Sequence, residues 1–261
     1  MPRPPISAFI IAKNEADRIG RSILSVCDWV DEVVVIDSGS TDQTVAVSES
    51  LGARVVFNAW RGYGPQKVFG EALCSNDWIL NIDADEEVSA ELREEIERLF
   101  AGGDLGNVAG YRLPVLPLYP FQASGHRWTV TNFPIRLYHR HRAGFSCSTV
   151  HDSVRPREGR VVKLRGLLIH RSFRSLSHHL EKINFYTSAQ AEDVVRKGPG
   201  PSAVKLILTP PLAFLRSFLF RREFVNGVDG VVISYMYAFQ RFMKVAKSRE
   251  LIRLNAPKKD D

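Results

Sequence analysis

Two aspartates, Asp83 and Asp85, close an apolar stretch of the chain and have the chemistry to bind a cation and a sugar. The stretch that precedes them, residues 77–83 (DWILNID), has the apolar character of a buried strand. In an extended segment the i, i+2 spacing places both carboxylates on one side. One can then hold a divalent cation while the other holds the sugar of a bound nucleotide. The alternative interpretation is an acidic turn that leads into a helix beginning near Ser89.

The segments before and after these aspartates alternate between strand and helix patterns. Short apolar runs predict four strands, at residues 6–12, 32–37, 53–57 and 77–83. Helical periodicity separates or follows them at residues 15–27, 42–51, 65–74 and 89–100. Near-continuous apolar strands joined by helices indicate a parallel sheet covered on both faces and wound right-handedly.

Polar clusters follow each of the four predicted strands. Ligands of such sheets bind beyond the carboxyl ends of the strands, so these clusters are expected on one rim. They are Lys13-Asn14-Glu15, then Asp37-Ser38-Gly39-Ser40-Thr41-Asp42, then Asn58 with Arg61 and Lys67, and finally Asp83 with Asp85. Each cluster alone also fits helix capping, with Ser40 or Thr41 as the N-cap of helix 42–51. The stretch 62–67 is not a P-loop, because it follows the third strand and lacks the Gly-Lys-Ser/Thr ending.

The second half of the chain has a different pattern. Isolated strands are predicted at 108–113, 133–139 and 161–169, followed by helices at 175–197, at 202–221 with a break at Pro210-Pro211, and at 228–248. We therefore expect a domain over 1–172 and a helical region over 173–261. Within the domain, residues 1–102 would bind the nucleotide, and residues 103–172 would form the side that meets the second substrate, the acceptor. No run reaches 18 uninterrupted apolar residues, so the chain is expected to lie on a bilayer rather than to cross it.

Composition and net charge restrict the kinds of partner that the chain can bind. The 261 residues are 44% hydrophobic and carry a net charge of +6, with basic residues denser after residue 125. Nucleic acid and acidic lipid would both suit this charge, but no nucleic-acid module is recognisable and we expect no nucleic-acid partner. The three cysteines have no metal-binding spacing and are interpreted as reduced packing residues.

Taken together, these motifs resemble family 2 glycosyltransferases of the GT-A fold, and among them the enzymes that add glucose to inner-core heptose of lipopolysaccharide. The resemblance over residues 5–100 lies in Ile11-Ala-Lys-Asn-Glu15, Val35-Ile-Asp-Ser-Gly-Ser-Thr-Asp42, Gln66-Lys67 and Asp83-Ala-Asp85. Shorter motifs extend it: Arg136-Leu-Tyr, Val150-His-Asp152, Leu168-Ile-His170 and Lys182-Ile-Asn-Phe-Tyr186. It implies a Rossmann-like domain with a mixed central sheet and an appended helical, membrane-associating region.

The resemblance also implies an inverting hexose transfer, most simply of glucose, from a UDP-sugar with Mg²⁺ or Mn²⁺. By position, Asn14, Glu15 and Asp37 would contact the uridine, with Ser38 beside them. Asp83 would contact the ribose and base, and Asp85 would bind the metal. Many family members carry a Glu-Asp pair where this chain has His151-Asp152.

Residue chemistry suggests further roles in such a transfer. Asp152 is the candidate general base, because a carboxylate near the acceptor can remove the hydroxyl proton. His151 and His170 are candidate metal ligands, and the alternative for each is a structural histidine. Candidate diphosphate contacts are Lys67, Arg127 and Arg136, since cations form strong charge-assisted bonds to phosphate oxygens.

The C-terminal helices combine bulky apolar residues with arginines, notably in residues 205–222. Such helices can lie in the headgroup layer against anionic lipid, and the alternative is a helical cap packed on the sheet. We expect a lipid-linked saccharide acceptor and a peripheral position on the cytoplasmic face of the bacterial inner membrane. Alternatives are an exopolysaccharide, polyprenyl-linked or peptide acceptor, or a catalytically silent nucleotide-sugar-binding membrane protein.

Overall fold

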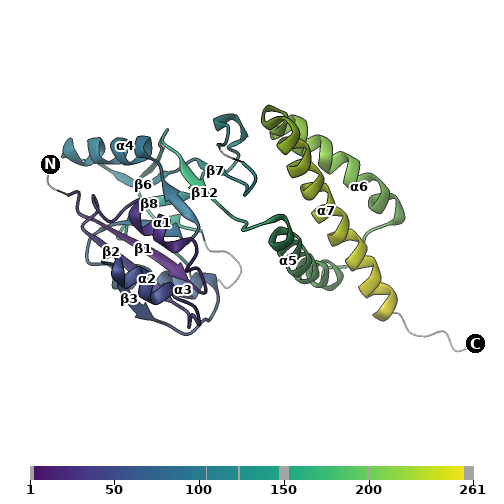
Figure 1. The fold of residues 1–261 in the computed structure, drawn as a ribbon, viewed down its shortest axis with the longest axis horizontal. Helices are drawn as coiled ribbons and strands as arrows, with labels where there is room; N and C mark the ends of the chain where they lie inside the picture. The colour runs from purple at the N-terminus through teal and green to yellow at the C-terminus, as the bar shows by residue number, and fades with distance from the viewer. Residues whose placement is uncertain (1–2, 104, 123, 147–152, 199, 256–261) are drawn as a thin grey trace, which may run out of the picture. The chain divides into compact units, whose positions relative to one another are not determined.

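The chain folds into two compact units in a computed structural model that describes residues 3–103, 105–122, 124–146, 153–198 and 200–255. The first unit comprises Met1–Pro117 and Thr131–Arg171. The second comprises Leu118–Val130 and Ser172–Asp261, so a short segment from the middle of the chain belongs with the C-terminal helices (Figure 1). Each unit is described here by itself.

A seven-stranded mixed sheet forms the centre of the first unit, and its strand order is β11-β6-β8-β4-β1-β2-β3. The four strands nearest the N-terminus run parallel, as predicted, and β8 runs antiparallel to both β4 and β6. The strands are β1 (Ile6–Ala12), β2 (Glu32–Asp37), β3 (Arg54–Phe57), β4 (Trp78–Asp83), β6 (Val108–Arg112), β8 (Ile135–His139) and β11 (Arg160–Lys163). The α/β class and the mixed sheet predicted from the sequence are confirmed.

Helices cover both faces of this sheet, and the alternation of side chains along β1 shows how. Ile6, Ala8 and Ile10 point into a core that also contains residues of α1 (Ile19–Leu24), α2 (Thr44–Ser50) and α4 (Ala90–Ala101). Phe9 and Ile11 point the other way, toward α3 (Tyr63–Leu73). α3 approaches closely at Gly70, where a Cβ atom would lie 2.7 Å from the Phe9 ring.

A smaller sheet lies beyond the end of β4 and was not predicted. It has the order β5-β12-β7 and consists of β5 (Glu86–Val88), β12 (Leu168–His170) and β7 (Val115–Pro117). A two-stranded sheet pairs β9 (Ala143–Gly144) with β10 (Arg155–Pro156). The acidic residues after Asp85 therefore begin a short strand before α4, which starts after the N-cap Ser89 as expected.

The predicted strand over 161–169 is wrong as a single element, because the chain leaves the large sheet after β11 and enters the small one at β12. Between the two strands, the Glu95 carboxylate of α4 accepts hydrogen bonds from the backbone N–H groups of Arg165 and Gly166, at 2.9 and 2.7 Å. At Gly166 a Cβ atom would lie 2.2 Å from the Leu92 Cα. This close passage over α4 separates the two strands.

The second unit is helical. It contains α5 (Leu176–Arg196), α6 (Ala203–Leu215) and α7 (Gly227–Asn255), with short turns η1 (Arg127–Thr129), η2 (Arg216–Phe220) and η3 (Glu223–Asn226). α7 packs against both α5 and α6: the Lys247 ammonium donates to the Asn184 carbonyl at 2.6 Å, and the Phe214 and Tyr235 rings lie 4.7 Å apart. Figure 1 shows the three helices in green to yellow.

One expectation for this unit is wrong. The predicted break at Pro210-Pro211 does not occur, because α6 continues through both prolines and is held along α7 by packing that outweighs the missing N–H donors. Among the described residues, one segment, Ala203–Phe220, is long and apolar enough by length and composition to cross a membrane. Its mean hydropathy is 1.5 although it contains Lys205 and Arg216, which interrupt the apolar run.

Candidate active site

The carboxyl ends of β1, β2 and β4 meet at one edge of the large sheet. In the strand register Ala12 lies opposite Asp37, and Ile11 lies opposite Asp83. The loops that follow these strands therefore start at the same level. The structure brings together Asn14, Asp37 and Asp83 at this edge, as predicted from the strand pattern.

The loops after β1 and β2 are joined by a hydrogen-bond network centred on Asp37. One Asp37 carboxylate oxygen accepts the backbone N–H groups of Gly39 and Ser40, at 2.8 and 2.9 Å. The other accepts the Ser40 hydroxyl at 2.5 Å. The Ser40 hydroxyl oxygen in turn accepts the Asn14 N–H at 2.9 Å, and the Asn14 side-chain oxygen accepts the Thr41 N–H at 2.8 Å. Asp37 is buried, so its first role is to fix the shape of these loops.

Backbone conformation at this edge matches the network. Asn14 adopts a φ of 56°, which is uncommon for a residue with a side chain, and Gly39 adopts a φ of 85°. Asn tolerates this region better than most residues because its short side chain bonds locally. Behind the loops, the buried Gln66 side chain of α3 donates to the Ser38 hydroxyl at 2.9 Å. Ser38 is thereby fixed beside Asp37.

Asp83 is the centre of a charged cluster at the end of β4. Lys67 of α3 lies 3.1 Å from one carboxylate oxygen, and Arg136 of β8 lies 2.7 Å from the other. Arg136 also contacts Glu86 at 2.6 Å and donates to the Asn81 side chain at 2.9 Å. The side chains of Lys67 and Glu86 are each 1% exposed, so two positive and two negative groups are held together largely out of water.

The pKa values of this cluster follow from burial and pairing. For Asp83, burial favours the neutral acid, but the charges of Arg136 and Lys67 outweigh it and hold its pKa well below the ordinary value. For Glu86, burial raises the pKa, and the Asp83 charge acts in the same direction against the Arg136 charge. The Asp83 N–H donates to the Glu86 carboxylate at 2.9 Å, which fixes the two acids relative to each other.

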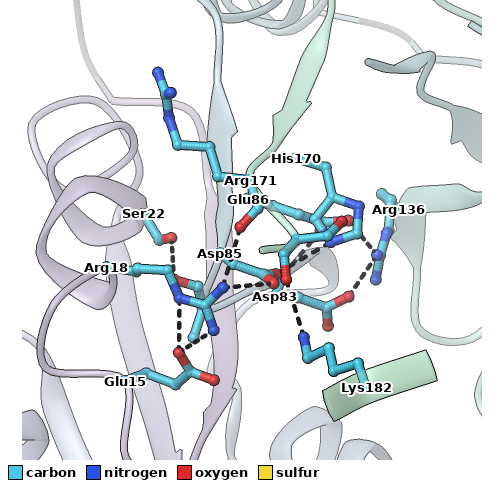
Figure 2. Close-up of polar contacts among 12 residues, drawn as sticks. Glu15, Arg18, Ser22, Asp83, Asp85, Glu86, Arg136, His170, Arg171 and Lys182 are labelled. Atoms are coloured by element: carbon cyan, nitrogen blue, oxygen red, sulfur yellow. Dashed lines mark hydrogen bonds and ion pairs between the residues drawn. The ribbon is translucent and has the colours of Figure 1, made fainter. Parts of the chain in front are cut away.

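Asp85 lies in the tight turn between β4 and β5 and faces His170 (Figure 2). Antiparallel pairing of β5 with β12 places His170 opposite Glu86, and its Nε2 atom lies 3.3 Å from an Asp85 carboxylate oxygen. The Arg18 guanidinium lies 3.4 Å from the other oxygen and also donates to the Arg171 carbonyl. From α1, the Ser22 hydroxyl donates to the Ala84 carbonyl at 2.8 Å and holds the turn in place.

The Asp85 and His170 pair shifts the pKa of each partner. Burial raises the pKa of Asp85, but the hydrogen bond and charge of His170 outweigh it and leave the pKa below its ordinary value. Burial lowers the pKa of His170, but the hydrogen bond and charge of Asp85 outweigh it and leave the pKa raised. A carboxylate and an imidazole this close are oxygen and nitrogen donors suited to one divalent cation.

Asp85 and His170 together supply two ligand atoms for a metal ion. Elsewhere among residues 3–103, 105–122, 124–146, 153–198 and 200–255 there is no group of three or more His, Cys, Asp or Glu side chains placed to hold a metal ion. A cation at Asp85 and His170 would therefore take its other ligands from a bound diphosphate and water, which suits Mg²⁺ and Mn²⁺.

The remaining predicted residues lie in different places. His151 and Asp152 lie outside the described residues, and Arg127 belongs to the second unit, in the turn η1. Glu15 lies beside the edge and pairs with Arg18, and its N–H donates to the hydroxyl of Thr44, the first residue of α2, at 2.8 Å. Lys67 and Arg136, predicted as diphosphate contacts, both hold Asp83.

Three residues of the site were missed from the sequence. Glu86 looked like part of an acidic turn, Asn81 like an ordinary strand residue, and Arg18 like a helix residue. The signal for Glu86 was a second carboxylate directly after Asp85. Arg18 and Asn81 carry no local signal, because their partners Asp85 and Arg136 are distant in the chain.

Comparison with known proteins shows the family to which the chain belongs. The family model described as Glycosyl transferase family 2 matches residues 7–153. An uncharacterized glycosyltransferase of Rickettsia typhi is 43% identical over 94% of this chain and 87% of the relative. The lipopolysaccharide core biosynthesis glycosyltransferase LpsC of Rhizobium meliloti is 34% identical over 100% of this chain and 98% of the relative.

A solved structure of glucosyl-3-phosphoglycerate synthase from Mycobacterium tuberculosis, in complex with Mn²⁺, UDP and its product, is also similar. It is 28% identical, covers 44% of each chain and has a TM-score of 0.34.

Proposed function

The chain belongs to glycosyl transferase family 2 and is a glycosyltransferase, and we propose that it moves a hexose, most simply glucose, from a UDP-sugar to a lipid-linked saccharide. The full-length similarity to a lipopolysaccharide core glycosyltransferase supports the lipopolysaccharide core as the acceptor, and within it we propose an inner-core heptose. The observation that carries the proposal is the edge where Asp83 ends β4, Asp85 follows it, and His170 faces Asp85 at 3.3 Å.

The donor would bind at the carboxyl edge of β1, β2 and β4. Asn14, Glu15, Asp37 and Ser38 would line the uridine, and Asp83 would meet the ribose. The network around Asp37 supports this assignment, because loops fixed before binding lose little conformational entropy when the nucleotide enters. The Asp83 side chain is 30% exposed and therefore accessible to a ribose hydroxyl even while Lys67 and Arg136 hold it.

Asp85 and His170 would hold the divalent cation, with His151 as a further candidate from outside the described residues. A bound Mg²⁺ or Mn²⁺ would neutralise the charge that develops on the departing diphosphate. Arg18 keeps Asp85 ionised and oriented. Arg127 stays a candidate diphosphate contact.

Inversion requires the acceptor hydroxyl to attack the anomeric carbon from the side opposite the diphosphate. The new bond forms as the bond from the sugar to the diphosphate breaks, and the hydroxyl proton must pass to a base. Asp152 is proposed as this base because a carboxylate positioned at the acceptor side can accept the proton at neutral pH.

The α6 and η2 segment, residues 203–220, is proposed to bind the membrane surface. Its outward apolar side chains recur every three or four residues, as on one face of a helix: Val204, Leu208, Leu212, Leu215 and Leu219. Ile207 and Phe220 are 71% and 81% exposed, and within the structure 11% of the segment is buried. Lys205, Arg216, Arg221 and Arg222 would face anionic headgroups, in keeping with a peripheral position on the cytoplasmic face.

The test is release of UDP from UDP-glucose with lipid A–core preparations truncated at successive sugars. We expect turnover with a core that ends at an inner heptose, its loss in EDTA, and a fall of at least about 100-fold in Asp85→Asn. Asp77→Asn is the matched control, since Asp77 precedes the same strand at its other end and its side chain is 58% exposed. Unchanged turnover in EDTA and in Asp85→Asn would refute the metal assignment.

A further inference from the structure

A pocket in the first unit borders the Asp83 cluster and has no assigned role. Its volume is about 370 Å³, within the range of about 300–1,000 Å³ typical of small-molecule sites. It is lined by Arg112, Asn132, Pro134, Ile135, Arg136, Phe145, Ser153, Val154, Arg155 and Pro156. Arg136 is common to both places, because its guanidinium lies 2.7 Å from Asp83 and its side chain also forms one wall of the pocket.

The pocket has an apolar floor and a polar rim. Ile135, Phe145 and Val154 are buried and form the apolar part, while Asn132 and Ser153 are exposed at the rim. A sugar ring has the same division, with C–H groups on its faces and hydroxyls at its edge. The lining therefore suits a saccharide rather than a purely apolar ligand.

The charge of the pocket is one-sided. Among the described residues, ten line the pocket, of which three are arginines and none is acidic. The Arg136 charge is matched by Asp83 and Glu86. Arg112 and Arg155 are exposed, and within the part of the chain that the structure describes no carboxylate pairs with either. Two positive charges thus face a cavity in whose described lining there is no acidic side chain.

Arg112 is also oriented. One of its terminal nitrogens donates to the Phe133 carbonyl at 2.9 Å, which fixes the guanidinium while its other N–H groups stay available for a ligand. A guanidinium held in this way binds planar or tetrahedral oxyanions through two parallel hydrogen bonds.

We infer that this pocket binds an anionic substituent, a phosphate or a carboxylate, on the acceptor saccharide, with Arg112 and Arg155 as its recognition groups. The inference rests on the proposed function, because it takes the pocket beside the donor cluster to be the acceptor side. It specifies the acceptor class: a phosphorylated or acidic sugar rather than a neutral one.

The first experiment measures direct binding and needs no knowledge of the natural acceptor. Glucose 6-phosphate, glucuronate and glucose are titrated into the full chain by ligand-observed NMR, comparing the wild type with Arg112→Gln/Arg155→Gln. We expect at least one anionic sugar to bind, glucose to bind at least about 10-fold more weakly, and the double variant to lose this preference. The stronger of the two anionic probes distinguishes phosphate from carboxylate.

The matched control is Arg98→Gln, which removes an exposed arginine of α4 that does not line the pocket. It should bind all three sugars as the wild type does. Equal binding of glucose and both anionic sugars, or an unchanged preference in the double variant, would overturn the inference. Thermal melts of each variant check that the fold is retained.

The second experiment measures transfer. With a core acceptor that carries its phosphate groups, Arg112→Gln and Arg155→Gln should each raise the acceptor KM about 10-fold and leave calorimetric UDP binding unchanged. With the same acceptor after phosphatase treatment, the wild type and both variants should have similar KM values if phosphate is the group recognised. Anionic-sugar binding without UDP release on any saccharide would remove the proposed function and leave the anion site standing.

Discussion

Each of the two units places a different kind of group in an unfavourable environment: the first unit buries charged groups, and the second exposes apolar ones. The first unit buries charges: the side chains of Lys67 and Glu86 are 1% exposed and are held in ion pairs. The second unit exposes apolar surface: Ile207 and Phe220 are more than two-thirds exposed. Neither arrangement maximises the stability of the fold. Buried ions are stable only with partners, and exposed apolar patches mark contact surfaces.

The difference indicates two kinds of function. In the sheet unit, buried charges at a strand edge orient carboxylates toward a ligand, which is typical of a chemical site. In the helical unit, exposed apolar residues beside arginines are typical of a surface that meets lipid. Each assignment predicts that substitutions will have different consequences in the two units.

The largest expected effect is on the stability of the sheet unit. Arg136→Met removes the cation that neutralises Asp83 and Glu86, so the free energy of unfolding should fall by about 3–5 kcal/mol. Urea unfolding followed by tryptophan fluorescence measures it. Arg93→Met is the control, because the Arg93 pair with Asp28 is exposed and should cost at most about 1 kcal/mol. Equal losses in both variants would show that the buried cluster does not hold the site together.

The next effect concerns the helical unit and the membrane. Ile207→Asp/Phe220→Asp places two charges on the outward apolar face of residues 203–220, and we expect affinity for anionic vesicles to fall at least about 10-fold. UDP release from UDP-glucose without vesicles should be unchanged. Ala101→Asp adds a charge at the exposed end of α4 as the control and should bind vesicles normally. If the double variant still sediments with vesicles, this face is not the membrane contact.

A smaller effect is a difference in acid stability between the units. His179 is buried and stacks on Phe173 at 3.7 Å, and burial together with the nearby charges of Lys182 and His178 lowers its pKa to about 4. The folded unit therefore favours the neutral imidazole. Above a pH of about 6.5, the pKa of histidine in the unfolded chain, His179 contributes its full stabilisation of the fold. This contribution should be lost as pH falls toward about 4.

The Asp83 carboxylate of the sheet unit should respond at lower pH. The pKa of Asp83 is held below its ordinary value by Arg136 and Lys67, so stability from this carboxylate is lost only as pH falls below about 4. Hydrogen exchange by mass spectrometry at pH 7 and pH 5, corrected for intrinsic rates, resolves the two units. We expect the protection of α5 to fall first, and His179→Gln to remove most of that pH dependence. Loss of protection in both units together would contradict this order.

The four N-terminal strands and the position of the aspartates at their ends were predictable from the sequence, because they depend on local patterns. Apolar runs predicted β1, β2, β3 and β4 to within one residue at each end, and the parallel pairing follows from the helices between them. The edge that carries Asp37 and Asp83 then follows from topology. Helix starts were less accurate: the helix expected from residue 15 begins at Ile19, because the side chains of Thr44 and Asp42 bond the backbone N–H groups of Glu15 and Ala16 in a loop.

What could not be predicted depends on contacts between distant segments. β5 forms because β12 pairs with it, and Glu86 is a site residue because Arg136 reaches it from β8. Trp128 is 66% exposed, although tryptophan side chains are highly buried on average. A short stretch of sequence contains no information about which partner a lone Trp or Arg will meet.

The central claim is that Asp85 and His170 hold the cation that binds a nucleotide diphosphate at this edge. Calorimetric titration of UDP with and without Mn²⁺ tests it most directly, in the wild type, Asp85→Asn and the control Asp77→Asn. We predict that Mn²⁺ tightens UDP binding at least about 10-fold in the wild type and in Asp77→Asn, and that Asp85→Asn loses this gain while keeping the weak metal-free binding. An undiminished Mn²⁺ gain in Asp85→Asn would contradict the account.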